Sequence, residues 1–326
     1  MKTVFISLEA PVEVRWSWAA VAERIGATVT NLPAAATHGM PWNGVSARTL
    51  ASLPGLAFMP AETLAIVTDR VRIGDHLPAL PAVCASSVEE LRDHLGTSGV
   101  YLKPKDNFAK SRWGGSLEHT GWATVDDVPA QAYAEMVEGW LVACPLLPAP
   151  VHNLEIDFAV NGQGEVLVMH CFNHGFDAAD RPLRMTLDGV VPVELMGAVS
   201  TFCAANGVVG GIHNIQAVFY GGQWVVMDWN PRPTGMYPGF AHLHPGVADR
   251  GLAHMLGLPL PAPAPVYIEL RPYWDREIPN TRAADVREAG LHPRWVYDRR
   301  RIARIAGVAN TRAEVESRFT TLEETL

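Results

Sequence analysis

The sequence lacks the features that mark membrane, disulfide-rich and nucleic-acid-binding proteins. It has no apolar run of the roughly 18 residues that a membrane-spanning helix needs. Acidic residues outnumber basic ones, giving a net charge of −8, whereas a nucleic-acid-binding surface is basic. Its cysteines form no C-x-x-C pair, so we expect reduced thiols rather than a zinc site or a disulfide framework. These cysteines are Cys84, Cys144, Cys171 and Cys203. We therefore predict no membrane partner and no nucleic-acid partner.

The composition is that of an ordinary folded chain. Its 326 residues, 48% hydrophobic and 18% charged, are enough for two domains or for one domain with lobes. The N-terminal apolar run is too short for a signal peptide, so we expect a cytoplasmic protein. The sequence is also compatible with a homodimer.

The first half of the chain alternates strand and helix signals. A strand over 4–8, a helix over 14–25 and a strand over 27–32 predict a βαβ unit. Ser87 and Glu90 form a capping box, which predicts a helix running to Leu95. The other elements expected here are a loop over 33–44, helices over 62–72 and 126–137, and strands over 81–85, 100–105 and 117–119.

Two predicted β-hairpins dominate the second half. The first joins strands over 154–160 and 166–171 through Asn161-Gly162, because Asn-Gly favours the positive φ of a tight turn. The second joins strands over 212–220 and 223–229 through Gly221-Gly222. Further expected elements are helices over 193–205 and 247–256, strands over 267–272 and 295–308, and a final helix capped by Thr311 and Glu314. This order of elements predicts the α+β class.

The second hairpin carries oxygen-bearing side chains that share one face. Asp228 and Asn230 lie two residues apart on one strand, and Gln216 lies on the other. Carboxylate and amide oxygens beside substrate phosphates suit Mg²⁺, and the nearby Arg232 is a fork-shaped phosphate donor. A plain turn at Asn230-Pro231, with Asp228 as a surface acid, fits the same residues. Chemistry alone leaves both interpretations open.

Residues 207–237 combine a G-x-x-N-I-Q strand, a glycine turn and an acid-x-N-P-R end. This combination resembles the ATP-grasp superfamily of ligases, most closely the ATP-binding halves of carbamoyl-phosphate synthetase and the relatives of biotin carboxylase. The resemblance implies that Gln216, Asp228 and Asn230 bind the metal and that Arg232 is catalytic. The implied cofactors are ATP and Mg²⁺, as two ions, with Mn²⁺ as an alternative. Asp228 stands where glutamate is usual and is shorter by one methylene.

The same resemblance implies an ATP-grasp fold in which two α+β lobes clasp ATP behind a short βαβ pre-domain. The expected boundaries are 1–61 for the pre-domain, 62–140 for the small lobe and 141–326 for the large lobe. Upstream of the hairpin, Lys103 matches the phosphate-contacting lysine, Glu155 the ribose-binding glutamate, and Arg70, more weakly, a phosphate-facing cation. A solvated strand lysine, a surface acid and an exposed helical arginine are the alternatives for these three.

Two segments depart from the family pattern. The loop over 105–115 has few glycines and carries cations instead, which can replace N–H donors around a triphosphate. Lys110 and Arg112 are therefore predicted to be catalytic and Lys105 to bind nucleotide, with an exposed basic loop as the alternative. The hinge over 139–147 lacks the usual acid, so main-chain groups are expected to meet adenine. The residues assigned to that contact are Val142, Ala143, Cys144 and Leu146.

The implied reaction is ATP-dependent ligation of a small carboxylate to an amine or similar nucleophile through an acyl-phosphate, giving ADP and phosphate. His170 and His174, with Arg181 and Arg184, are candidates for a carboxylate contact, although a plain surface loop fits them equally. The departures in the loop and the hinge keep two other hypotheses open. One is a catalytically silent nucleotide-binding protein, and the other is a small-molecule kinase.

Overall fold

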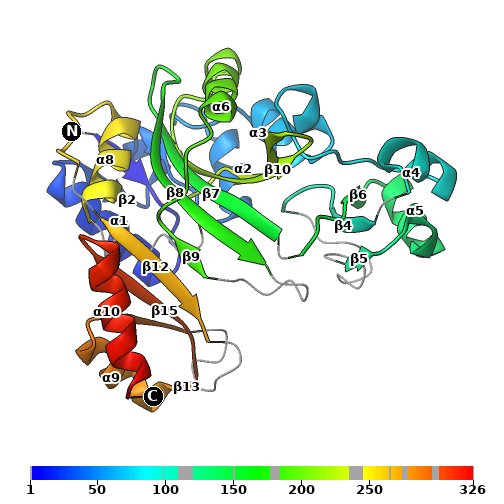
Figure 1. The fold of residues 1–326 in the computed structure, drawn as a ribbon. Coiled ribbons are helices and arrows are strands. Elements are labelled where there is room, and N and C mark those ends of the chain that lie inside the picture. The colour runs from blue at the N-terminus through cyan, green and yellow to red at the C-terminus, as the bar shows by residue number, and fades with distance from the viewer. Residues whose placement is uncertain are drawn as a thin grey trace.

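The computed structural model describes residues 2–97, 99–108, 120–149, 151–176, 184–234, 245–263, 266–273, 278–295 and 301–325. These residues form a three-stranded parallel sheet at the N-terminus, a three-stranded antiparallel sheet and a nine-stranded sheet, with helices packed around them (Figure 1). This arrangement confirms the predicted α+β class. No helix within these ranges is long and apolar enough to cross a membrane.

The N-terminal unit is a βαβ unit with its strands in the order β2-β1-β3. Its elements are β1 (Thr3–Phe5), α1 (Val12–Arg24), β2 (Thr28–Thr30), η1 (Pro33–Ala35), β3 (His38–Gly39) and α2 (Gly44–Ser52). The helix α3 (Ala61–Thr68) and the 3₁₀ helix η2 (Arg72–Asp75) follow it. Trp18 of α1 is buried in an apolar cluster with residues of α8 (Pro245–Leu256), so this unit packs against the second half of the chain.

The antiparallel three-stranded sheet and its helices, residues 88–145, stand to one side of the molecule in Figure 1 and are called the small lobe from here on. Compared with the predicted range of 62–140, this lobe adds its last strand and omits the first part of that range. It consists of α4 (Val88–Leu95), β4 (Val100–Pro104), β5 (Thr120–Trp122), η3 (Val125–Asp127), α5 (Ala130–Val137) and β6 (Leu141–Pro145). Its strands are ordered β5-β4-β6, and α4 and α5 bury Leu91 and Met136 against them. The Ser87 hydroxyl accepts the Glu90 N–H, so Ser87 caps α4 as predicted, but the predicted capping box is incomplete, because the Glu90 carboxylate accepts from Ser86 instead.

The nine-stranded sheet forms the body of the molecule, in the order β11-β10-β7-β8-β9-β12-β15-β13, with β14 paired to β15. Its first part contains β7 (Val151–Val160), β8 (Val166–Phe176), β9 (Met185–Thr186), α6 (Val193–Ala205), β10 (Ile212–Tyr220) and β11 (Gln223–Asn230). One face of β7 and β10 presents apolar residues such as Leu154, Ile156 and Ile215, which pack against α2, α3 and α6. Because side chains alternate along a strand, the residues between them lie on the opposite face.

The C-terminal part extends the sheet and covers its far end. It contains β12 (Tyr267–Pro272), β13 (Ile278–Pro279), η4 (Asn280–Arg282), α9 (Ala283–Glu288), β14 (His292–Trp295), β15 (Arg301–Ala309) and α10 (Arg312–Glu323). Thr311 and Glu314 form the predicted capping box of α10. Phe319 and Val315 of this helix pack onto β15, where Gly307 leaves space for them.

Several elements differ from the sequence predictions. The first hairpin turns through a longer loop, in which Gly164 rather than Gly162 has positive φ, and the Asn161 side chain accepts the N–H groups of Gln163 and Glu165. The predicted helix over 62–72 ends at Thr68, and the predicted strand over 81–85 is only an isolated bridge at Val83. The helices α2 and α9 were not predicted. The expected strand over 117–119 lies outside the described residues.

Gly211, just before β10, gives a test of the packing beneath the sheet. Its φ is +102°, and an added Cβ would lie 2.8 Å from Nε2 of the buried His213 and 3.2 Å from Phe58. We expect Gly211→Ala to lower the free energy of unfolding by about 1–3 kcal/mol. Gly162→Ala is the matched control, because nothing lies within 4 Å of its Cβ position. Equal melting temperatures for the two variants would contradict the close packing of His213 and Phe58 against Gly211.

Candidate functional site

The face of the central sheet opposite the α6 core is lined with polar side chains. Register places Asn214 opposite Asn230, and Gln216 opposite Asp228, on the hairpin β10–β11. The neighbouring strand β7 places Asp157 beside Asn214 and Glu155 beside Gln216. His170 of β8 lies opposite Asp157, so the polar face spans four strands. Near the turn of this hairpin, Val218 and Val225 form an apolar cluster with Leu80 and with Val142 and Cys144 of β6.

Asp228 is the charged centre of this face. Its Oδ1 lies 2.6 Å from Nη2 of Arg70, and its Oδ2 lies 2.8 Å from Nζ of Lys103. Burial alone would raise the pKa of Asp228, but the charges of Arg70 and Lys103 outweigh it and lower the pKa below its ordinary value. Arg70 also donates to the carbonyl of Pro104. The structure thus brings together Arg70, Lys103 and Asp228, three residues predicted separately from the sequence.

The three predicted metal ligands, Gln216, Asp228 and Asn230, lie on one face of the hairpin. They offer one carboxylate and two amide oxygens, which are hard donors of the kind that Mg²⁺ takes together with phosphate oxygens. No group of three His, Cys, Asp or Glu side chains capable of metal binding occurs among the described residues. Both oxygens of Asp228 contact Arg70 or Lys103, so Mg²⁺ at these three side chains would need phosphate oxygens to complete its ligand set.

A second charged cluster lies one strand away, on β7. Glu155 accepts a 2.5 Å hydrogen bond from the Thr234 hydroxyl and lies 3.5 Å from Nδ1 of His174. Burial works to raise the pKa of Glu155, but these two partners lower it overall. For Asp157, burial and the charge of Glu155 raise the pKa to about 8. Burial lowers the pKa of Arg232, against the opposing effect of these two acids.

In the hinge strand β6, the main-chain N–H and C=O groups that were expected to meet adenine are already hydrogen-bonded within the protein. The N–H and carbonyl of Ala143 are both bonded to Val83, at 2.9 and 3.0 Å. The opposite edge of β6 pairs with β4, where Val142 lies across from Lys103. Within this strand, an adenine contact at Ala143 would have to displace Val83. Of the residues assigned to adenine, Leu146 follows the strand, and its N–H is bonded to the carbonyl of Gly99.

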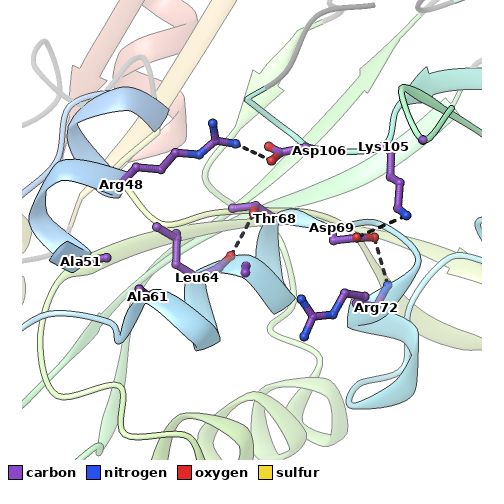
Figure 2. Close-up of a pocket in the computed structure, with 11 residues that line it drawn as sticks. Arg48, Ala51, Ala61, Leu64, Thr68, Asp69, Arg72, Lys105 and Asp106 are labelled. Carbon is purple, nitrogen blue, oxygen red and sulfur yellow. Dashed lines mark hydrogen bonds and ion pairs between the residues drawn. The ribbon is translucent and has the colours of Figure 1, made fainter. Parts of the chain in front are cut away.

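Lys105 lies apart from Lys103 and lines a pocket of about 520 Å³ that Lys103 does not line. Figure 2 shows Lys105 directed toward Asp69, with an Nζ–Oδ2 distance of 3.7 Å, and Arg48 paired with Asp106. Ala61 and Leu64 of α3 line this pocket together with Arg72 of η2. The lining of this pocket thus includes Lys105 and Arg72 but not Arg70, Lys103 or Asp228.

Four further cations were predicted for the phosphate loop and for the carboxylate contact. Lys110 and Arg112 lie outside the described residues, as does Arg181. Arg184 is paired with the buried Glu269 at 2.6 Å, so this candidate for a carboxylate contact already has an acidic partner within the protein.

Sequence reasoning missed Asp157, Asn214 and Thr234. Asp157 and Asn214 are 1% exposed or less, and Thr234 is 4% exposed. Their signal was present in the alternation of N-L-E-I-D-F and H-N-I-Q, which places each of the first two on the same face as a residue that was predicted.

No protein-family profile and no curated protein sequence matches the chain. Solved structures do match it over nearly their whole length. N5-carboxyaminoimidazole ribonucleotide synthetase from Thermus thermophilus has a TM-score of 0.65 at 15% identity, covering 99% of this chain and 98% of its own. Phosphoribosylamine–glycine ligase from Thermotoga maritima has a TM-score of 0.65 at 14% identity, covering 99% and 96%. Carboxyaminoimidazole ribonucleotide synthase from Aspergillus clavatus, complexed with ATP, has a TM-score of 0.62 at 14% identity, covering 99% of this chain and 97% of its own. At these identities the likeness shows the fold.

Removing the carboxylate at the centre of the site should destabilise the protein. Asp228→Asn would leave two largely buried cations without their partner, which typically costs about 3–5 kcal/mol. We expect a clear fall in melting temperature, measured without nucleotide. Asp93→Asn, at an exposed position of α4, is the control and should melt like the unmodified protein. Unchanged melting of the Asp228 variant would show that the two ion pairs do not form.

The raised pKa of Asp157 gives a pH test. In the folded protein the Asp157 carboxyl keeps its proton up to about pH 8, whereas in the unfolded chain it loses the proton near the ordinary pKa of 3.8. The stability that the protonated Asp157 contributes is therefore lost as pH rises from 3.8 to about 8. The melting temperature of Asp157→Asn, minus that of the unmodified protein, should increase from pH 6 to pH 8 and level off above it. A difference independent of pH would show that Asp157 is already ionised at pH 6.

Proposed function

Because the chain has the ATP-grasp fold, we propose that it is an ATP-dependent ligase. It activates a small carboxylate as an acyl-phosphate, which an amine or similar nucleophile then attacks, and it releases ADP and phosphate. The observation that carries this proposal is the meeting of Lys103, Arg70 and Asp228 on the polar face between the lobes. Two buried cations beside one carboxylate leave a net positive charge, which favours a polyphosphate.

Several of the predicted site residues have a role in this proposal. Lys103 and Arg70 bind nucleotide phosphates, and Arg232 donates to the phosphoryl group being transferred. Gln216, Asp228 and Asn230 hold Mg²⁺, which neutralises charge on the phosphate oxygens when bound. The apolar residues between β6 and the hairpin, such as Val142 and Val218, provide a surface suited to adenine.

The chemistry asks the protein mainly for positioning and charge neutralisation. A carboxylate oxygen of the substrate attacks the γ-phosphorus, and the bond to the leaving ADP oxygen breaks. The nucleophile then attacks the acyl carbon, phosphate leaves with the bonding electron pair, and the proton of the nucleophile passes to solvent or to a base. Cations near the transferred group stabilise the charge that develops in both steps.

The matched structures support nucleotide binding by this fold. The Aspergillus clavatus enzyme is complexed with ATP in one structure, and with ADP and 5-aminoimidazole ribonucleotide in another. Phosphoribosylamine–glycine ligase bears the name of a carboxylate–amine ligase. At 14–15% identity these likenesses leave the acid and the nucleophile of this chain open.

Phosphate release separates the proposal from its alternatives. The protein is incubated with ATP, Mg²⁺ and a panel of small acids, each with and without an amine. A ligase releases phosphate only when both partners are present, whereas a small-molecule kinase gives a stable phosphorylated product with the acceptor alone. Nucleotide binding without turnover on any pair would favour the catalytically silent alternative. Absence of ATP binding by calorimetry would falsify all three.

The two neighbouring lysines give a sharper test of the nucleotide site. Lys103→Met should weaken binding of a non-hydrolysable ATP analogue by about tenfold or more, because a buried charge-assisted phosphate contact is lost. Lys105→Met should change the affinity by less than about threefold, since Lys105 faces Asp69 instead. Calorimetry on both variants, with melting curves as a check of folding, measures this contrast. Equal losses would mean that Lys105 also reaches the nucleotide.

A further inference from the structure

A chain of hydrogen bonds leads from the metal-facing residues into the central sheet. The Asn230 amide nitrogen donates to Oδ1 of Asn214, at 3.3 Å. The Asn214 amide nitrogen donates to Oδ1 of Asp157, at 3.2 Å. The same Asp157 oxygen accepts the backbone N–H of Thr234, also at 3.2 Å. Asp157, Asn214 and Thr234 thus connect to Asn230 without contributing to the predicted metal set themselves.

The direction of this chain is fixed at its inner end. A backbone N–H can only donate, so Oδ1 of Asp157 accepts from Thr234; with the carboxyl proton on Oδ2, Oδ1 has no hydrogen to donate and also accepts from Asn214. Asn214 must then present its NH₂ group to Asp157, and its own oxygen accepts from Asn230. The NH₂ of Asn230 is used in this way, which leaves the Asn230 oxygen as the atom of this amide that can bind a metal.

Burial makes the orientation costly to reverse. Asp157 is 0% exposed and Asn214 is 1% exposed, so water cannot replace a lost hydrogen bond. Flipping the Asn214 amide would set its oxygen against the Asp157 oxygen and its NH₂ against the NH₂ of Asn230. Both contacts would then be repulsive, and two buried polar groups would lose their partners.

We propose that Asp157 and Asn214 are positioning residues that set the amide of Asn230, so that its oxygen faces the metal. The proposal rests on the function proposed above. Thr234 supplies the fixed donor, and its hydroxyl bond to Glu155 ties down the segment that carries Arg232. This hydrogen-bond chain from Thr234 through Asp157 and Asn214 to Asn230, called the relay below, thereby orients Asn230 and fixes the segment that follows it.

A double-mutant cycle on metal binding tests the relay. Mn²⁺ affinity is measured by electron paramagnetic resonance, with the protein saturated by a non-hydrolysable ATP analogue. Asp157→Ala should weaken Mn²⁺ binding by about tenfold, the usual effect of removing a partner of a metal ligand. Asn230→Ala should weaken it at least as much. Asp157→Ala should add almost nothing in the Asn230→Ala background, because the effect of Asp157 on the metal passes through the Asn230 oxygen.

Two further variants separate the relay from a general structural role. Asp157→Asn retains an oxygen that can accept from Thr234 and Asn214, so it should keep Mn²⁺ affinity within about twofold. Asn153→Ala removes an equally buried amide from the same face of β7, outside the relay, and should also leave Mn²⁺ affinity unchanged.

The outcomes distinguish this inference from the function on which it rests. Additive losses from Asp157→Ala and Asn230→Ala would overturn the relay while leaving nucleotide-dependent metal binding intact. Loss of Mn²⁺ affinity in Asn153→Ala equal to that in Asp157→Ala would also overturn it. Absence of any nucleotide-dependent Mn²⁺ signal from the unmodified protein would reject the proposed function and the relay with it.

Discussion

The interaction on which the site depends is the double ion pair at Asp228. Its three residues come from three different parts of the chain. Arg70 lies between α3 and η2, Lys103 lies on β4 of the small lobe, and Asp228 lies on β11 of the large sheet. A carboxylate this buried is costly unless it is paired, so the pairing fixes the position of β4 relative to the hairpin. Residues suited to phosphate and to metal therefore meet at one point.

The two faces of one sheet account for both the stability and the chemistry of this protein. Leu154 and Ile156 alternate along β7 with Glu155 and Asp157, so the same strand supplies the apolar core and the polar site. The apolar face packs against helices and holds the strands in register. Register in turn aligns Asn230, Asn214 and Asp157 across three strands. A shift of one residue would move the polar groups into the core.

Local signals in the sequence predicted most of the helices and strands, but not every turn, strand end or long-range contact. The caps of α4 and α10 were predicted because each depends on a few adjacent residues. The turn at Asn161 was predicted wrongly, because its side chain bonds to later backbone groups and supports a longer loop with Gly164 at positive φ. Motif resemblance assigned both Lys103 and Lys105 to the nucleotide, whereas the structure directs them to different acids, because β4 ends between them and Lys105 faces Asp69. The partners of Asp157 lie 57 and 77 positions away, and such contacts exist only once the sheet has formed its register.

Under the proposed function, the charge balance of the two clusters lets one face serve both phosphate and metal. Around Asp228, one carboxylate faces two cations, so the cluster is positive and attracts anions. Near Arg232, the raised pKa of Asp157 leaves Glu155 as the ionised member of the acid pair near neutral pH, so one acid balances one cation. If Asp157 were ionised, its charge would compete with a phosphate for Arg232. Its protonation therefore keeps Arg232 available to an anion while the neutral carboxyl still accepts hydrogen bonds from Thr234 and Asn214.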